Sequence, residues 1–210
     1  MEWSYHFEGE ERVLSPALVY YEEILAENTR RAVLEAGGAK RLWPHIKTHK
    51  SPDLVRMLEN FGIERFKCAT LAEAEMAANA GARHILLAYP LVGPNIGEYV
   101  KLTCRYPEQT FWALGDDLGQ LAALGETGRK YGREIPFLVD VNTGMNRTGV
   151  PMDAVLEFYK KASRIPGISV KGLHCYDGER HEKEFSQRLR QTEKTAEWVW
   201  KSKQALTADG

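Results

Sequence analysis

Short apolar runs alternate with longer amphipathic segments along most of the chain. Runs such as Phe66–Thr70, His84–Ala88 and Thr110–Leu114 have the length of buried β-strands. The segments between them repeat apolar residues every three or four positions, which is the spacing of one face of an α-helix. The alternation predicts successive strand–helix units, and such units build a parallel sheet.

Six strands and seven helices follow from this pattern. The strands are expected over residues 41–50, 66–70, 84–88, 110–114, 136–141 and 170–175, after a shorter strand over residues 17–21. The helices are expected over residues 22–36, 52–60, 71–80, 96–106, 117–131, 152–164 and 183–206. Pro44 counts against a central position for the strand that contains it.

The number of repeats favours a barrel. Six strand–helix units without a G-x-G-x-x-G motif after the first strand indicate a TIM-type (β/α)8 barrel rather than a Rossmann sheet. Eight such units take roughly 250 residues, whereas this chain has 210. We therefore expect one α/β domain over residues 1–210, an incomplete barrel of about six units from a longer protein. A smaller open sheet is the alternative.

Composition and charge narrow the class of protein. Hydrophobic residues make up 43% of the chain and charged residues 27%, which is ordinary for a globular protein. With 28 basic and 29 acidic residues the net charge is −1, so we expect no nucleic-acid partner. No run approaches the roughly 20 apolar residues that cross a bilayer, and the start of the chain lacks the pattern of a signal peptide.

The cysteines indicate a reducing compartment. Cys68, Cys104 and Cys175 are odd in number and widely spaced, which argues against a disulfide framework and against a structural zinc site. We therefore expect a cytoplasmic protein.

The carboxyl ends of the predicted strands carry the candidate chemistry, because the active sites of parallel barrels lie there. In the run H-I-K-T-H-K, strand alternation would place His45, Lys47 and His49 on one face. A lysine that points into a barrel is costly unless it is paired, deprotonated or covalently modified, and a desolvated lysine is what a Schiff base requires. An exposed basic strand end is the alternative.

Two further strand ends stand out. The loop D-V-N-T-G-M-N-R-T-G, which begins at Asp140, combines turn-forming residues with Arg147, whose planar fork of donors suits an anionic oxygen. An ordinary turn with a surface arginine is the alternative. The strand end from His174 to Asp177 has the residue types of a metal site, but consecutive strand residues diverge. This favours His174 and Tyr176 as the wall of a cofactor site.

At these places the chain resembles a known family. The run from Pro44 to Lys50 is similar to the P-H-x-K-T-H-K signature of the D-threonine aldolase and D-serine dehydratase group. This group belongs to the alanine-racemase-like fold-type III pyridoxal 5'-phosphate (PLP) enzymes. The segment C-A-T-L-A-E-A-E from Cys68, the loop from Asp140 and the S-P-A-L-V run from Ser15 resemble further segments of the group. The resemblance implies a barrel of the alanine racemase N-terminal type, with the family's C-terminal β domain absent from this chain.

The resemblance also implies roles for particular residues. Lys47 would carry PLP as a Schiff base, and Arg147 would donate to the phenolate oxygen of the cofactor. His174 would sit against the pyridine ring and Tyr176 near the cofactor or substrate. The full cofactor-binding set that we expect is Lys47, His45, Thr70, Arg147, His174 and Tyr176, with His49 as a further candidate. The family implies a divalent metal, Zn or Mn, whose ligands would lie outside this chain.

The implied activity is that of a PLP-dependent lyase on D-3-hydroxy amino acids. It would perform either a retro-aldol cleavage, as D-threonine aldolase does, or an elimination, as D-serine dehydratase does. A non-catalytic PLP-binding protein and an amino-acid racemase are the alternatives. The implied partners are a small D-amino acid substrate and, by analogy, a second copy of the chain in a homodimer.

Overall fold

One parallel sheet of six strands organises the structure, a computed structural model that describes residues 5–208. The strands are β1 (Arg65–Cys68), β2 (His84–Leu87), β3 (Thr110–Gly115), β4 (Ile135–Asn142), β5 (Val150–Pro151) and β6 (Ile168–Cys175). β1 to β4 are neighbours in chain order, β6 pairs with β4 along most of its length, and the short β5 pairs with the carboxyl end of β4. Five of the seven predicted strands are therefore confirmed, while β5 was not predicted.

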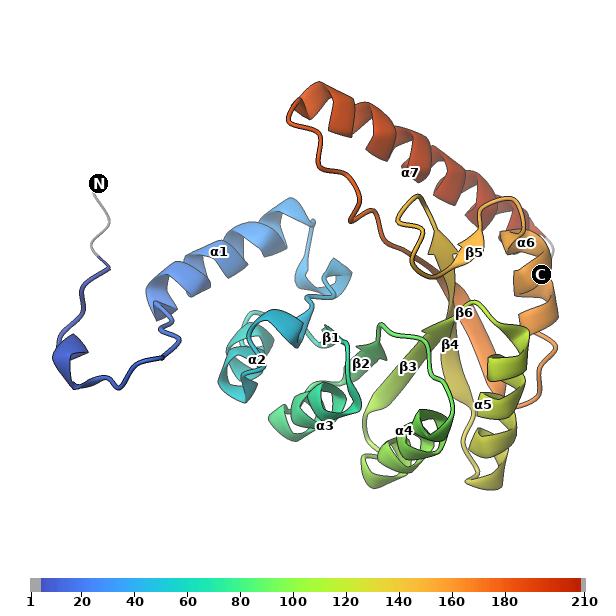
Figure 1. Ribbon diagram of the computed structural model, residues 1–210, viewed down its shortest axis with the longest axis horizontal. Coiled ribbons are helices and arrows are strands. Elements are labelled where there is room, and N and C mark those ends of the chain that lie inside the picture. Colours follow the sequence, from blue (N-terminus) through green and yellow to red (C-terminus); the bar gives the residue numbers. More distant parts are fainter. Residues whose placement is uncertain (1–4, 209–210) are drawn as a thin grey trace.

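Seven α-helices accompany the strands, in the predicted order. They are α1 (Glu22–Glu35), α2 (Pro52–Glu59), α3 (Leu71–Ala80), α4 (Pro94–Arg105), α5 (Leu118–Lys130), α6 (Val155–Ala162) and α7 (Phe185–Ala208). In Figure 1, α2 to α5 follow one another around the outer side of the curved sheet, whereas α1 extends away from it. The side chains of Ser51, Thr70 and Asp117 begin α2, α3 and α5 by accepting a backbone N–H of the first turn.

The hydrophobic core lies between the sheet and these outer helices. Strand alternation directs Phe66 and Cys68 of β1 into this layer, where both are fully buried. The opposite faces of the strands point into the concave interior of the sheet. There Trp43 meets Trp112 of β3 edge to face, with 5.8 Å between the ring centroids. Aromatic rings from β3 and from the segment before β1 therefore pack against each other inside the concave face.

The strand expected over residues 17–21 does not form. The segment has no sheet partner among the described residues, and Leu18, Val19 and Tyr20 are exposed. An apolar run forms a strand only where a neighbour pairs with its backbone N–H and C=O groups. Residues 17–21 have no such neighbour among the described residues, so the prediction of a strand there is wrong.

The strand expected over residues 41–50 is also wrong. A 3-10 turn over Ile46–Thr48 replaces its second half, and a single parallel bridge joins His45 to Lys67 of β1. The backbone N–H of Lys67 donates to the oxygen of Pro44 at 2.8 Å. Proline has no N–H, so Pro44 cannot donate to β1 before this bridge, and the 3-10 turn ends the pairing after it.

The sheet has the parallel order of a barrel that is not closed within residues 5–208. β1 and β6 do not pair with each other in this part of the chain. The concave interior therefore opens between the first and the last strand, as the curvature in Figure 1 shows. The predicted α/β architecture is confirmed.

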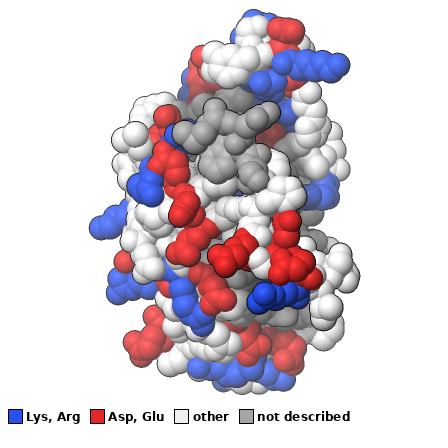
Figure 2. Space-filling view, turned by 90° about the vertical axis from the view of Figure 1, so that its left-hand side faces the viewer, with Lys and Arg blue, Asp and Glu red and all other residues white. Residues whose placement is uncertain are grey.

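The surface carries charge of both signs. On the face that Figure 2 shows, acidic and basic side chains are interspersed, in keeping with the net charge of −1. Among the helices within residues 5–208, none combines the length and the apolar character needed to cross a membrane.

Close packing at Gly125 of α5 gives a test of the fold. A Cβ atom at Gly125 would lie 2.4 Å from the backbone oxygen of Pro166, whereas one at Gly97 of α4 would meet nothing within 4 Å. Gly125→Ala should lower the free energy of unfolding by about 1–3 kcal/mol, as overpacking does. Gly97→Ala should be neutral or stabilising by up to ~1 kcal/mol, because alanine favours a helix. Urea unfolding measures both, and equal effects would contradict the packing described.

Candidate active site

A small hollow lies at the carboxyl ends of the central strands. Its lining residues are Ala88, Leu114, Asp140, Val141, Met145, Arg147, Thr148, His174 and Tyr176. They come from the ends of β3, β4 and β6 and from the segments that follow β2, β4 and β6, which is where parallel barrels place their active sites. The structure thus brings together three residues chosen from the sequence: Arg147, His174 and Tyr176.

A buried carboxylate organises this hollow. Asp140, which is 5% exposed, accepts hydrogen bonds from Nδ1 of His174 at 2.7 Å and from the hydroxyl of Thr148 at 2.8 Å. Asp140 and His174 are partners in the register of β4 and β6, so the sheet itself sets this contact. Because a carboxylate only accepts, Nδ1 of His174 carries a proton and donates to Asp140.

Arg147 lies on a loop that a neighbouring amide holds in shape. The side-chain oxygen of Asn142 accepts from the backbone N–H groups of Gly144 and Asn146, at 3.1 and 3.0 Å. The guanidinium of Arg147 lies over the ring of Tyr176, with 5.5 Å between its central carbon and the ring centroid. Arg147 is exposed, so its donors can meet an anionic oxygen.

Only glycine fits where this loop returns to β4. Gly149 has a φ of 106°, and a Cβ atom there would lie 2.4 Å from the backbone nitrogen of Asn142. The N–H of Gly149 donates to the carboxylate of Asp116 at 2.6 Å. This close return places Thr148 beside Asp140 and lets β5 pair with β4.

Lys67 of β1 is a residue of this region that the sequence interpretation missed. Its Nζ lies 3.4 Å from Nε2 of His174, so the side chain crosses the concave interior from β1 to β6. Burial, and after it the charge of Lys47, lowers the pKa of Lys67, while the charge of Asp140 opposes this change. Strand alternation is the signal that could have found Lys67, because its two neighbours in β1 are buried in the outer layer.

The predicted alternation of His45, Lys47 and His49 along a strand is wrong. Lys47 lies in the 3-10 turn and is exposed, so it is not the desolvated lysine that the strand interpretation implied. Its positive charge nevertheless contributes to lowering the pKa values of both His45 and Lys67. Among the described residues, Lys47, His45 and Thr70 are outside the set that lines the hollow.

The two histidines of this segment accept backbone hydrogen bonds. Nδ1 of His45 accepts from the N–H of Lys47 at 3.3 Å, and Nδ1 of His49 accepts from the N–H of Ser51 at 3.1 Å. Burial is the largest cause that lowers the pKa of His45 to about 4, and the charges of Lys47 and Lys67 add to it. Burial also lowers the pKa of His49. Both rings therefore favour the neutral form.

Thr70 begins α3, and a glutamate in the first turn of this helix contacts the end of the segment that carries Lys47. Its hydroxyl accepts from the N–H of Glu73 at 3.1 Å, and the carboxylate of Glu73 accepts from the N–H of Ala69 at 2.8 Å. Glu73 is 4% exposed and also pairs with Nζ of Lys50 at 3.0 Å. Lys50 has a φ of 48°, so this ion pair holds the end of the turn in a conformation that lysine rarely adopts.

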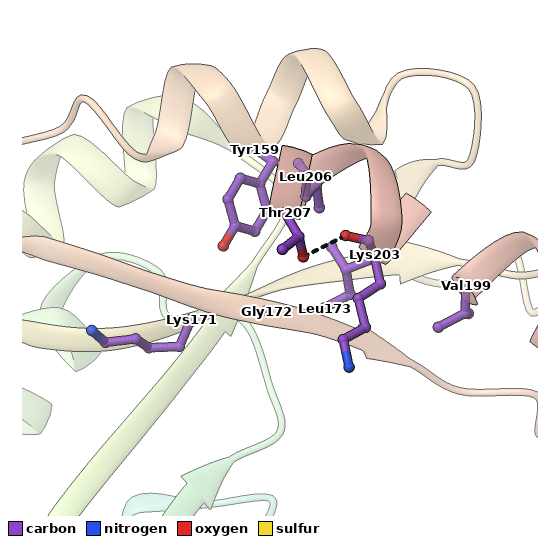
Figure 3. A pocket seen from close by; sticks show the side chains of 8 residues that line it. All are labelled: Tyr159, Lys171, Gly172, Leu173, Val199, Lys203, Leu206 and Thr207. Atoms are coloured by element: carbon purple, nitrogen blue, oxygen red, sulfur yellow. Dashed lines mark hydrogen bonds between the residues drawn. The ribbon is translucent and has the colours of Figure 1, made fainter. Parts of the chain in front are cut away.

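A larger hollow of about 460 Å³ lies between β6, α6 and α7 (Figure 3). Its walls are largely apolar, with Tyr159, Leu173 and Val199 among them. The dashed line in Figure 3 marks the hydroxyl of Thr207, which donates to the backbone oxygen of Lys203 at 2.8 Å. None of the candidate residues lines this hollow, so the candidate chemistry belongs to the smaller one.

The metal implied by the family resemblance has no site in the described part of the chain. Within residues 5–208, no three His, Cys, Asp or Glu side chains gather as metal ligands would. Cys175 follows His174, but burial, with the charges of Asp140 and Asp177, raises the pKa of its thiol to about 11. The thiol therefore stays protonated near neutral pH, which suits neither a ligand nor a nucleophile.

Comparison with known proteins gives the class of the chain. The family model described as the alanine racemase N-terminal domain matches residues 22–207. The chain therefore belongs to this family, and its parallel, barrel-like sheet is the family's fold. The family resemblance stated from the sequence is confirmed.

Particular relatives are named as aldolases. The chain is 27% identical over 208 residues to 3-hydroxy-D-aspartate aldolase of Paracoccus denitrificans (strain Pd 1222), covering 96% of this chain and 53% of that protein. It is 29% identical over 138 residues to D-threonine aldolase of an Arthrobacter species, covering 65% and 36%. The crystal structure of D-threonine aldolase from Filomicrobium marinum matches with a TM-score of 0.86 at 26% identity, over 94% of this chain and 54% of that one. The chain thus spans about half the length, or less, of these proteins.

Acid should destabilise the protein partly through His45. Its pKa is about 4 in the folded protein against an ordinary 6.5. Between these values the unfolded chain binds a proton that the folded chain does not, so stability contributed by the neutral ring is present above pH 6.5 and is lost as the pH falls toward 4. Urea unfolding at several pH values should show a smaller loss for His45→Gln than for the wild type. Parallel curves for the two proteins would contradict this assignment.

Proposed function

We propose that the chain is the PLP-binding barrel domain of a lyase that acts on D-3-hydroxy amino acids. The observation that carries the proposal is the convergence of Arg147, His174 and Tyr176 on one hollow at the carboxyl ends of parallel strands. This arrangement occurs in a chain of the alanine racemase N-terminal family. The names of similar proteins, two kinds of aldolase and a D-threo-3-hydroxyaspartate dehydratase, favour a lyase over a racemase.

The donor chemistry around the hollow suits PLP, which combines an aldehyde, an anionic phenolate oxygen and a phosphate on a flat ring. Lys47, although exposed rather than desolvated, offers a primary amine, and Arg147 offers a fork of donors for an anionic oxygen. The imidazole of His174 offers a flat surface, and Asp140 fixes its orientation. When bound, PLP supplies an electron sink for bonds that break at the Cα atom of an amino acid.

The residues of this chain bind, orient and move protons. In this proposal the amine of Lys47 would hold PLP through the aldehyde group of the cofactor. When that amine is free, Lys47 would take a proton from the Cα atom of the substrate or return one to it. Arg147 donates to the anionic oxygen, and the ring of Tyr176 supports its guanidinium from one side.

The bond that breaks at Cα separates the candidate activities. If the β-hydroxyl loses its proton and the Cα–Cβ bond breaks, Cα takes up a proton, and the products are glycine and an aldehyde. If the Cα proton and then the β-hydroxide leave, water hydrolyses the resulting imine to a 2-oxo acid and ammonia. Return of the Cα proton to the opposite face gives racemisation, and a PLP-binding protein without activity breaks no bond.

The proposal includes the oligomeric state and the location of the protein. Analogy with the family suggests a homodimer, and the three free cysteines, which fit a reducing compartment, suggest the cytoplasm. We assign no step to a metal ion, because the described residues offer no group of ligands for one.

Borohydride trapping tests Lys47 as the amine that bonds PLP. Added PLP should give an absorption band at the edge of the visible range, and reduction should fix the cofactor to Lys47, where peptide mass spectrometry locates it. Lys47→Ala should abolish the band, because the variant lacks the amine. Lys101→Ala, which removes a surface lysine paired with Glu98 on α4, should keep it. Cofactor trapped on Lys67 in the wild type would show that the assignment to Lys47 is wrong.

Product analysis tests the reaction. The full-length protein with PLP is given D-threonine, D-3-hydroxyaspartate and D-serine, with the L-enantiomers as controls. Glycine reports cleavage, and ammonia with a 2-oxo acid reports elimination; either supports the proposal. Lys47→Ala should lower the rate by roughly 10³-fold or more, as loss of a catalytic nucleophile does. PLP binding without turnover, or interconversion of enantiomers alone, would rule out the lyase.

A further inference from the structure

A chain of hydrogen bonds crosses the concave interior and ends at the loop that carries Arg147. It runs from Nζ of Lys67 to Nε2 of His174 at 3.4 Å, and from Nδ1 of His174 to Asp140 at 2.7 Å. The hydroxyl of Thr148, the residue after Arg147, donates to the second oxygen of Asp140 at 2.8 Å. One network therefore connects β1, β6, β4 and the loop after β4.

The direction of each hydrogen bond in this chain is fixed by chemistry. The carboxylate of Asp140 can only accept, so Nδ1 of His174 donates to it. The ammonium form of Lys67 can only donate, so in its hydrogen bond with Nε2 the lysine is the donor and Nε2 the acceptor. Both ring nitrogens of His174 are thus engaged at opposite edges of the ring, and together they set its tautomer and its plane.

The positive charge of Lys67 also helps to balance the buried negative charge of Asp140. The side chains of Asp140 and His174 are 7% and 13% exposed, so the negative charge of Asp140 is largely shielded from water. A buried charge needs an opposite charge nearby, because burial without one costs several kcal/mol. His174 in its neutral form supplies none, whereas Lys67 lies at the other end of the same hydrogen-bonded chain.

We propose that Lys67 is a positioning residue of this site: its hydrogen bond to Nε2 holds His174 as the Nδ1–H tautomer with the ring in one plane. The inference rests on the proposed function only in one respect, namely that the ring of His174 would face bound PLP. With both nitrogens occupied, His174 offers the cofactor the face of its ring rather than an N–H donor. The two lysines would then have separate tasks: the exposed Lys47 would hold the cofactor by its aldehyde, and the half-buried Lys67 orients the ring of His174.

Nitrogen NMR of the imidazole rings in the cofactor-free protein tests the hydrogen bond directly. The protein has six histidines, and the His174 signals are those that disappear in His174→Gln. The wild type should show a protonated Nδ1 and an Nε2 that accepts a hydrogen bond. In Lys67→Met, the Nε2 signal should shift toward that of a free acceptor and broaden, because the ring is less constrained. Lys67→Arg keeps a donor and should restore the wild-type pattern.

Titration with PLP supplies the second readout. Lys67→Met should weaken PLP binding roughly tenfold, whereas Lys67→Arg should recover most of the affinity. Lys171→Met is the matched control, because Lys171 is an exposed residue of β6 outside the network, and it should change neither readout.

The two readouts separate the two proposals. If Lys67→Met folds and leaves the Nε2 signal of His174 unchanged, the positioning role is wrong, whatever happens to stability or to PLP affinity. If the Nε2 signal responds as expected but the wild type does not bind PLP, the positioning role stands and the proposed function fails.

Discussion

The candidate site depends on one buried carboxylate, that of Asp140. Its two oxygens hold His174 of β6 and Thr148 of the loop after β4, so a single side chain links two adjacent strands to the loop that carries Arg147. Each contact has a structural cause: the β4–β6 register brings His174 opposite, and the close return at Gly149 brings Thr148. A buried carboxylate with fewer partners would be costly, so the geometry of the site and the stability of this part of the fold are coupled.

The positive groups of the region differ in environment rather than in type. Lys67 is partly buried and contacts His174, Lys47 is exposed on the 3-10 turn, and Arg147 is exposed and lies over the ring of Tyr176. Burial lowers the pKa of Lys67, and the charge of Lys47 adds to that effect. This gradient from a shielded to an exposed cation suits a site that receives an anionic, flat molecule from the open side of the sheet.

The sequence was most informative where local pattern and tertiary context agree. All seven helices and the strands β1, β2, β3, β4 and β6 were predictable from periodicity, and Arg147, His174 and Tyr176 from their places at strand ends. It was least informative near residues 17–21 and 41–50, because apolar or alternating residues form a strand only when another strand pairs with them. The role of Lys67 was missed because a side chain that reaches from β1 to β6 leaves no mark in local spacing.

The amino-acid sequence alone thus determined the order of the elements, the parallel architecture and the family, since periodicity and short motifs are local properties that survive without coordinates. Only the tertiary structure decided which of two lysines is shielded from water, which partner fixes the tautomer of His174, and that Thr70 begins a helix away from the hollow. These depend on distances between residues far apart in the chain, and such distances are set by strand register and side-chain burial rather than by sequence spacing.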